Sequence, residues 1–175
     1  MWHTGCNLIY ARGTMSTGTF YSPSVNNLPK WANCFPAVDL SYLTVSRSVR
    51  ADRGRIFQAI TVPEYMETWL SAPGSIPGYT RVLFDHASFS ISGPTDDGSS
   101  FRIGCTLRQC RRSKLVFSWQ RDSLAETAPS TVRIRLQGDF DRTTVDVTHT
   151  GLSERERRWC GAFWEASIEK LSRLF

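Results

Sequence analysis

The stretch from residue 142 to residue 175 constrains the fold most, because an alternating strand leads directly into a long amphipathic helix. Ser153 and Glu156 have the spacing of a capping box, in which each side chain satisfies a backbone N–H of the other's turn. Apolar residues then recur every three or four positions, at Cys160, Phe163, Trp164, Ile168, Leu171, Leu174 and Phe175. Arg155, Arg158, Glu165, Glu169 and Arg173 fill the opposite side. Such a helix, about 33 Å long, needs a large apolar partner such as a whole sheet.

The composition is that of one globular domain with a tail, since 175 residues with 41% hydrophobic residues can build a single core. The formal charge of +5 comes from scattered arginines and not from a run, so it indicates a basic surface and no nucleic-acid partner. We therefore expect no nucleic-acid site. The expected state is a monomer or a homodimer.

The cysteines and the N-terminus bear on the compartment. Five cysteines form no C-x-x-C pair and no metal-ligand spacing with the three histidines, so we expect reduced thiols, no metal and no cofactor. No signal peptide is recognisable at the N-terminus, and no apolar stretch approaches the roughly 20 residues that span a bilayer. The sequence therefore predicts a cytoplasmic protein without a membrane span.

Residues 1–41 show no sustained period and are rich in Gly, Ser, Thr, Asn and Pro, which predicts an irregular N-terminal arm. The arm has many aromatic residues for a solvated tail, so we expect part of it to dock on the domain or on a partner. A true start at Met15 would explain the same composition.

From Tyr42 the hydrophobic pattern becomes regular. A half-buried strand occupies residues 42–51. Asp52 is placed to cap a short helix, and Pro63 to begin a second one, which ends at the Ala-Pro-Gly of residues 72–74. Six strands follow between turn signals, at residues 79–84, 87–92, 101–110, 114–119, 131–138 and 143–149.

This order predicts an α+β fold in which a curved seven-stranded antiparallel sheet wraps one long C-terminal helix. Alternate positions on the strands are apolar and polar, so one face of the sheet is covered and the other is wet. Because a single helix must cover the apolar face, the sheet has to curve around it. The two short helices are then expected to form a lid over a concave, largely apolar site.

Several strings resemble the START-like (SRPBCC, birch-pollen-allergen-like) superfamily, and within it homologues of the C-terminal domain of the activator of heat-shock protein 90 ATPase. They are VSRSVRADRGRIFQAITVPEYMETWL, PTDDG, SKLVFSW, VDVTHTGL and FWEASIEKL, in this order. The resemblance covers residues 42–175 and implies a helix-grip fold and one ligand-binding domain there. The chain departs from the family pattern at Asp52, Val62 and Leu70, where the family often has Pro, Asp and Trp. These positions touch the lid and the cavity entrance, so they bear on the ligand more than on the fold.

The resemblance leaves three functions open, since the superfamily is diverse. The first is non-catalytic binding of a small hydrophobic molecule in a cavity between the long helix and the sheet. The second is a protein-interaction module acting on a chaperone or another stress-related partner. The third is a polyketide cyclase or aromatase. A filled interior would favour the interaction module, and an enclosed cavity with converging polar groups would favour catalysis.

Two polar residues are candidates for the site because they are in phase with the covered face. His149 could orient a ligand carbonyl or transfer a proton, or it could be a structural histidine at the end of its strand. Arg47 could bind a carboxylate or phenolate, or it could pair with an acid or extend to the rim. Six aromatic residues could wall a pocket, or could simply form core: Trp69, Phe89, Phe117, Trp119, Phe163 and Trp164.

A basic cluster at one hairpin, Arg108, Arg111, Arg112 and Lys114, could meet an acidic partner. Its ordinary role would be a solvated turn that discourages association between strand edges.

Overall fold

The computed structural model describes residues 42–124, 128–138 and 140–175, so the predictions about an irregular arm at residues 1–41 lie outside the described residues. β1 (Tyr42–Val49) is followed by α1 (Arg53–Ala59) and α2 (Pro63–Trp69). The Asp52 carboxylate accepts hydrogen bonds from the backbone N–H groups of Gly54 and Arg55, which confirms it as the cap of α1. Val62 precedes α2 and makes no side-chain cap, as its side chain dictates.

Six strands follow the two short helices, as the turn pattern predicts. They are β2 (Arg81–Asp85), β3 (Ser88–Pro94), β4 (Ser100–Arg111), β5 (Lys114–Arg121), β6 (Ser130–Gly138) and β7 (Thr143–Thr150), with a 3₁₀ turn, η3 (Asp122–Leu124), after β5. All neighbours pair antiparallel in the order β1-β7-β6-β5-β4-β3-β2. The register between β4 and β5 shifts between Leu107 and Gln109, a bulge that increases the local twist.

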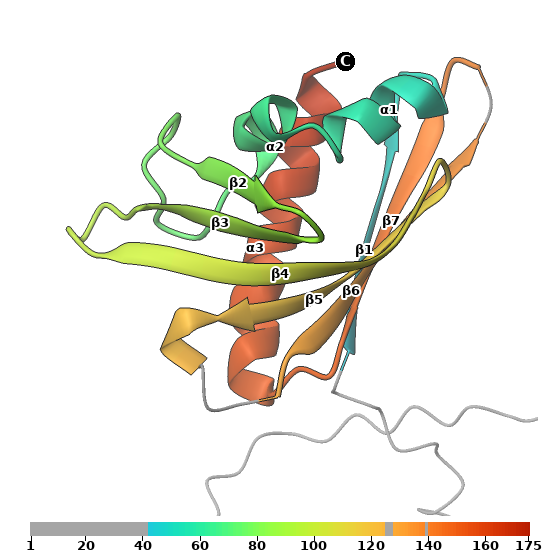
Figure 1. Ribbon diagram of the computed structural model, residues 1–175. Helices are drawn as coiled ribbons and strands as arrows, with labels where there is room; N and C mark the ends of the chain where they lie inside the picture. The colour runs from blue at the N-terminus through green and yellow to red at the C-terminus, as the bar shows by residue number, and fades with distance from the viewer. Residues whose placement is uncertain (1–41, 125–127, 139) are drawn as a thin grey trace, which may run out of the picture. The chain divides into compact units, whose positions relative to one another are not determined.

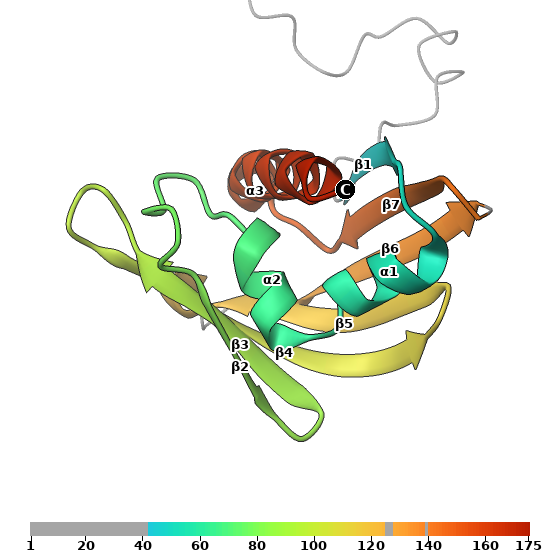
Figure 2. The same cartoon turned by 90° about the horizontal axis from the view of Figure 1, so that it is seen from above.

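α3 (Glu154–Arg173) begins at the predicted capping box, in which Ser153 and Glu156 each bond a backbone N–H of the other. The helix runs along the concave side of the sheet, with its first turn at the bottom and the C-terminus at the top (Figure 1). Seen from above, the sheet curves around α3, and α1 and α2 lie at the same end as the C-terminus (Figure 2). The helix-grip arrangement is therefore as predicted. None of the described helices is long and apolar enough to cross a membrane.

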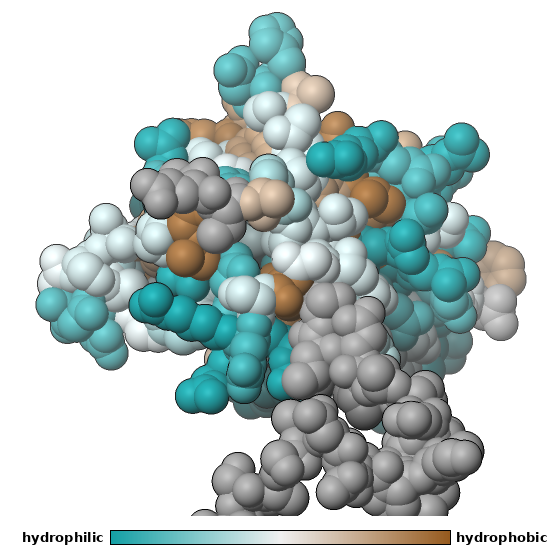
Figure 3. Space-filling view, turned by 90° about the horizontal axis from the view of Figure 1, so that it is seen from below, coloured by the Kyte–Doolittle hydropathy of each residue, from teal (hydrophilic) through white to brown (hydrophobic). Residues whose placement is uncertain are grey.

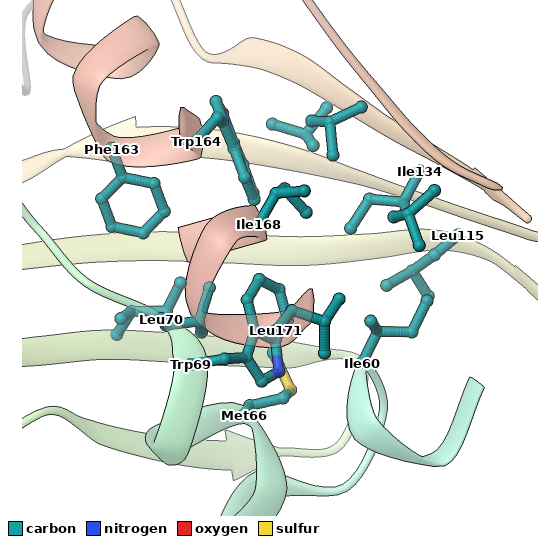
Figure 4. Packing of buried hydrophobic residues seen from close by; sticks show 14 of the residues in the cluster. Ile60, Met66, Trp69, Leu70, Leu115, Ile134, Phe163, Trp164, Ile168 and Leu171 are labelled. Carbon is teal, nitrogen blue, oxygen red and sulfur yellow. The ribbon is translucent and has the colours of Figure 1, made fainter. Parts of the chain in front are cut away.

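The core lies between α3 and the sheet. Phe163, Trp164, Ile168 and Leu171 of α3 lie among buried side chains from α1, α2 and the strands (Figure 4). Polar bonds fix the short helices on this core. Trp69 Nε1 donates to the carbonyl of Ala59 at 2.8 Å, which ties α2 to α1. The Ser71 backbone N–H donates to Ser167 Oγ at 3.0 Å, which ties the segment after α2 to α3.

Candidate functional site

The six predicted pocket aromatics are all buried in the core. Five of them form a continuous set of ring contacts between the sheet and α3. The ring centroids of Phe89 and Phe117 are 5.3 Å apart, and those of Phe117 and Trp119 are 6.5 Å apart. The Trp119 centroid lies 5.1 Å from that of Phe163 and 5.3 Å from that of Trp164. Such spacings are those of directly packed rings. The sixth, Trp69, is the last residue of α2, and its indole N–H donates to the Ala59 carbonyl of α1.

His149 is fully buried and joins this aromatic set by two hydrogen bonds. Trp164 Nε1 donates to His149 Nδ1 at 3.1 Å, and His149 Nε2 lies 2.8 Å from Ser130 Oγ. An indole nitrogen can only donate, so Nδ1 accepts and the proton of the neutral ring sits on Nε2, facing Ser130. The Ser130 hydroxyl then donates to the carbonyl of Trp119 at 3.2 Å. Burial lowers the pKa of His149 to about 3, so the ring stays neutral and holds α3 to the sheet.

Arg47 lies at the edge of the sheet, where nearly half of its side chain is exposed. Its Nη2 is 3.9 Å from Glu169 Oε2 of α3. Arg47 therefore pairs with an acid at the rim of the domain, as the second of its two sequence-based alternatives described. Arg47 pairs with Val145 across the β1–β7 ladder, and His149 lies four residues further along β7. The two predicted polar groups are therefore about 13 Å apart along the strand direction and do not converge on one point.

Arg121, which was not singled out in the sequence, is an arginine on the covered face of the sheet. It is in phase with Phe117 and Trp119 on β5 and lies opposite buried Ile103 of β4. Its guanidinium carbon lies 3.9 Å from the ring centroid of Trp159 on α3, and the Trp159 ring stacks on Phe163. Burial lowers the pKa of Arg121, which marks a cation partly removed from water. The two-residue alternation along β5 could have identified Arg121, as the alternation along β1 identified Arg47.

A hollow of about 660 Å³ opens beside this stacked pair, between the end of β5 and the first turns of α3. We call it the Arg121 hollow; its lining residues are Pro73, Arg121, Glu154, Arg155, Arg158, Trp159 and Ala162. Among the described residues, no carboxylate forms an ion pair with any of its three arginines. The end of the molecule at which α3 begins is mainly hydrophilic, with small hydrophobic areas between the polar side chains (Figure 3). The hollow thus combines an aromatic wall with excess positive charge.

A second hollow, of about 800 Å³, lies at the other end of the domain. We call it the Phe140 hollow; it is lined by Asp52, Arg53, Gly54, Arg55, Phe57, Gln58, Thr61, Arg112, Gly138 and Phe140. A third, smaller one adjoins the Arg121 hollow on the outer side of α3. None of the eight sequence-predicted site residues lines any of these three hollows.

The sequence of the chain matches one protein family over most of its length. The model of the family described as "Activator of Hsp90 ATPase homolog 1-like protein" matches residues 50–175. No curated protein matches the sequence.

Solved structures of similar fold have low sequence identity to this chain. Protein CV1439 from Chromobacterium violaceum has a TM-score of 0.65 and 15% identity, over 77% of this chain and 96% of that chain. Protein MLL2253 from Mesorhizobium loti has a TM-score of 0.57 and 22% identity, over 76% of this chain and 95% of that chain. DynU16, from the dynemicin biosynthetic locus, has a TM-score of 0.58 and 20% identity, over 76% of this chain and 46% of that chain. These likenesses establish the fold.

Proposed function

The chain belongs to the Activator of Hsp90 ATPase homolog 1-like family, within the START-like superfamily, and we propose that it binds a small amphipathic anion in the Arg121 hollow. The ligand would have a flat apolar part and one acidic group, such as a carboxylate or phenolate. This keeps the expected place of the ligand, between the helix and the sheet. The proposed contact residues lie at the start of α3, whereas the aromatic contact residues predicted from the sequence lie in the core.

The observation that carries the proposal is the stacking of Arg121 on Trp159 inside an open hollow. Stacking uses one face of the guanidinium and leaves its in-plane N–H groups available, which suits a planar carboxylate. The remaining apolar lining, Pro73 and Ala162, offers a wall for the flat part of a ligand. Arg155 and Arg158 add positive charge around it, against the carboxylates of Glu154 in the lining and of Glu156 near Arg121.

The placement of the other candidates supports binding over catalysis. Both ring nitrogens of His149 are already hydrogen-bonded, and its low pKa means that the neutral ring does not take up a second proton near neutral pH. Arg47 is engaged with Glu169 at the rim. A cyclase that polarises its substrate with both residues would need them at one point, and they are about 13 Å apart.

The test is a fluorescence titration of the full chain with two matched probes. 1-Anilinonaphthalene-8-sulfonate carries an acidic group, and N-phenyl-1-naphthylamine has a similar ring system without it. We expect Arg121→Gln to weaken binding of the anionic probe about tenfold or more, because charge-assisted hydrogen bonds contribute about 1.5–3 kcal/mol. Binding of the neutral probe should change little. Trp159→Leu should weaken both probes, because it removes a lining ring of the hollow and the surface on which Arg121 is held.

Two controls make the titration decisive. Arg47→Gln removes an arginine that lies at the sheet edge and lines none of the three hollows, so it should leave both affinities unchanged. Arg112→Gln removes a cation from the Phe140 hollow and reports any probe bound there. If Arg121→Gln binds the anionic probe as tightly as the unaltered chain does, the proposed site is wrong. Native mass spectrometry of freshly purified protein would then identify any ligand retained elsewhere.

A second candidate function is that of a protein-interaction module acting on the Hsp90 ATPase, as the family description suggests. The observation that favours it is the packed interior, in which the six predicted pocket aromatics are core residues. The ATPase rate of purified Hsp90 should then rise when the full chain is added. An unchanged rate in the presence of excess chain would rule this function out.

A further inference from the structure

The β6–β7 loop carries the most exposed of the large apolar side chains that the structure describes. Phe140 is 96% exposed, whereas the next most exposed, Leu83 on β2, is 65% exposed. Leaving a phenylalanine ring in water forgoes the free energy that its burial would yield. A ring presented in this way at the tip of a loop is suited to insertion into an apolar layer.

Arginines line the hollow to which this ring belongs. The Phe140 hollow has walls from α1 and from two hairpins, and it contains Arg53, Arg55 and Arg112. Among the described residues, none of these three arginines has an ion pair with a carboxylate. Arg55 instead lies over the Phe175 ring, with its guanidinium carbon 5.0 Å from the ring centroid. The three guanidinium groups are therefore available to an external anion.

Among the described residues, Asp52 is the single acid that lines this hollow, against three arginines. The Asp52 carboxylate is occupied as the cap of α1, bonded to the N–H groups of Gly54 and Arg55. Asp141 follows Phe140 on the same loop, and Arg142 comes directly after it. Arg111, next to Arg112 at the β4–β5 turn, is also exposed. The lining of the hollow therefore carries more positive than negative charge, and Arg112 of the basic hairpin belongs to it.

We propose that this end of the domain docks on an anionic lipid surface, with Phe140 entering the acyl region and the arginines of the Phe140 hollow holding an acidic headgroup. Charge complementarity and the uncovered Phe140 ring support this docking. Cations at the level of the headgroups and an aromatic ring beyond them match the layering of a membrane interface. α1, the β6–β7 loop and the C-terminus share one end of the molecule, and the start of α3 lies at the other (Figure 1). The lipid surface would therefore leave the Arg121 hollow accessible.

The experiment is co-sedimentation of the full chain with vesicles. Vesicles of phosphatidylserine and phosphatidylcholine should bind the chain, and vesicles of phosphatidylcholine alone should bind it much more weakly. Raising the salt concentration should release it. Phe140→Ser should weaken binding to the anionic vesicles about tenfold or more, from the lost burial of one ring. Arg112→Gln should weaken it about fivefold, the usual contribution of one basic residue near such a surface.

Matched variants separate docking from adhesion. Leu83→Ser removes another exposed apolar side chain, on β2, and Arg102→Gln removes an exposed cation that pairs with Asp122. Both should leave vesicle binding unchanged. The proposal is overturned if the chain ignores anionic vesicles, or if Leu83→Ser weakens binding as much as Phe140→Ser does. It is also overturned if inorganic phosphate binds in the hollow while vesicles do not.

Discussion

Trp164 gives the strictest test of whether the space between α3 and the sheet is solid core. The ring is 1% exposed, packs against Trp119 and Phe163, and donates to His149 Nδ1. Truncating a buried Trp to Ala costs about 3–5 kcal/mol. It also leaves the His149 acceptor buried without a donor, which costs about 1–3 kcal/mol. We therefore expect Trp164→Ala to lose about 4–8 kcal/mol in the free energy of unfolding.

Trp164→Phe separates the two contributions, because it keeps most of the apolar ring and removes only the N–H donor. It should lose about 1–3 kcal/mol. The assay is equilibrium urea unfolding followed by circular dichroism, with Trp159→Ala as the control for a half-buried tryptophan. Since small domains are stable by only about 5–15 kcal/mol, Trp164→Ala should be close to unfolding in water. A loss below about 2 kcal/mol, accompanied by stronger binding of an apolar probe, would show that the ring borders empty space and would refute the packed interior.

Three further predictions follow from single groups. Burial lowers the pKa of His149 to about 3, against an ordinary value of 6.5. Between these two pH values the unfolded chain binds a proton that the folded chain does not. The free energy of unfolding should therefore fall as the pH drops from about 6.5 toward 3, by at most about 1.4 kcal/mol per pH unit. His149→Gln can still accept from Trp164 and donate to Ser130, but it does not titrate in this range. The pH dependence of its unfolding free energy, measured by urea unfolding, should therefore lack this contribution. An unchanged pH dependence would assign the effect to other groups. Asp52→Ala should cost about 1 kcal/mol of unfolding free energy through loss of the α1 cap, and Asp52→Asn should restore most of it, whereas equal losses would point to the charge and not to the hydrogen bonds. Burial raises the pKa of the Cys160 thiol to about 12 and also raises that of Cys105. After brief alkylation of the native chain, peptide mapping should therefore find exposed Cys110 modified well before either of them. Early modification of Cys160 would mean that α3 opens from the sheet.

The fold was largely predictable because its determinants are local. Ser153 and Glu156 specify the start of α3, and Asp52 specifies that of α1, through bonds within one turn. The alternation of apolar and polar residues along each strand predicts which face of the sheet is covered. A shift by one residue would turn every apolar side chain toward water. The bulge between Leu107 and Gln109 was missed because no local signal separates an extra residue from a continuing strand.

The candidate site was less predictable because it depends on where elements meet. A period of two places Arg47 and Arg121 on the same face of the sheet, but it does not say which lies beneath the helix and which at the rim. Arg47 meets Glu169 near the end of α3, and Arg121 meets Trp159 near its start. Trp159 lies beside the apolar stripe of α3 and was not singled out. Only the placement of α3 across β5 brings the two together.

His149 shows the opposite case, in which the position was predicted correctly and the chemistry was left between two alternatives. The strand pattern placed the ring on the covered face at the end of β7. Its two hydrogen bonds depend on Trp164 and Ser130, which belong to other elements. The structural alternative could be separated from a catalytic one only with these partners in place.

Ligand binding in the Arg121 hollow, outside a packed core, can be tested by ¹⁵N nuclear magnetic resonance. The indole N–H signals of the six tryptophans would be followed in a titration and assigned by single substitutions. The full chain would be titrated with 1-anilinonaphthalene-8-sulfonate. We expect the Trp159 signal to shift on binding. The Trp164 indole N–H, which is bonded to His149, should keep its position and exchange slowly with solvent. Shifts of Trp119 and Trp164 with an unmoved Trp159 would place the ligand inside the core and contradict binding in the Arg121 hollow.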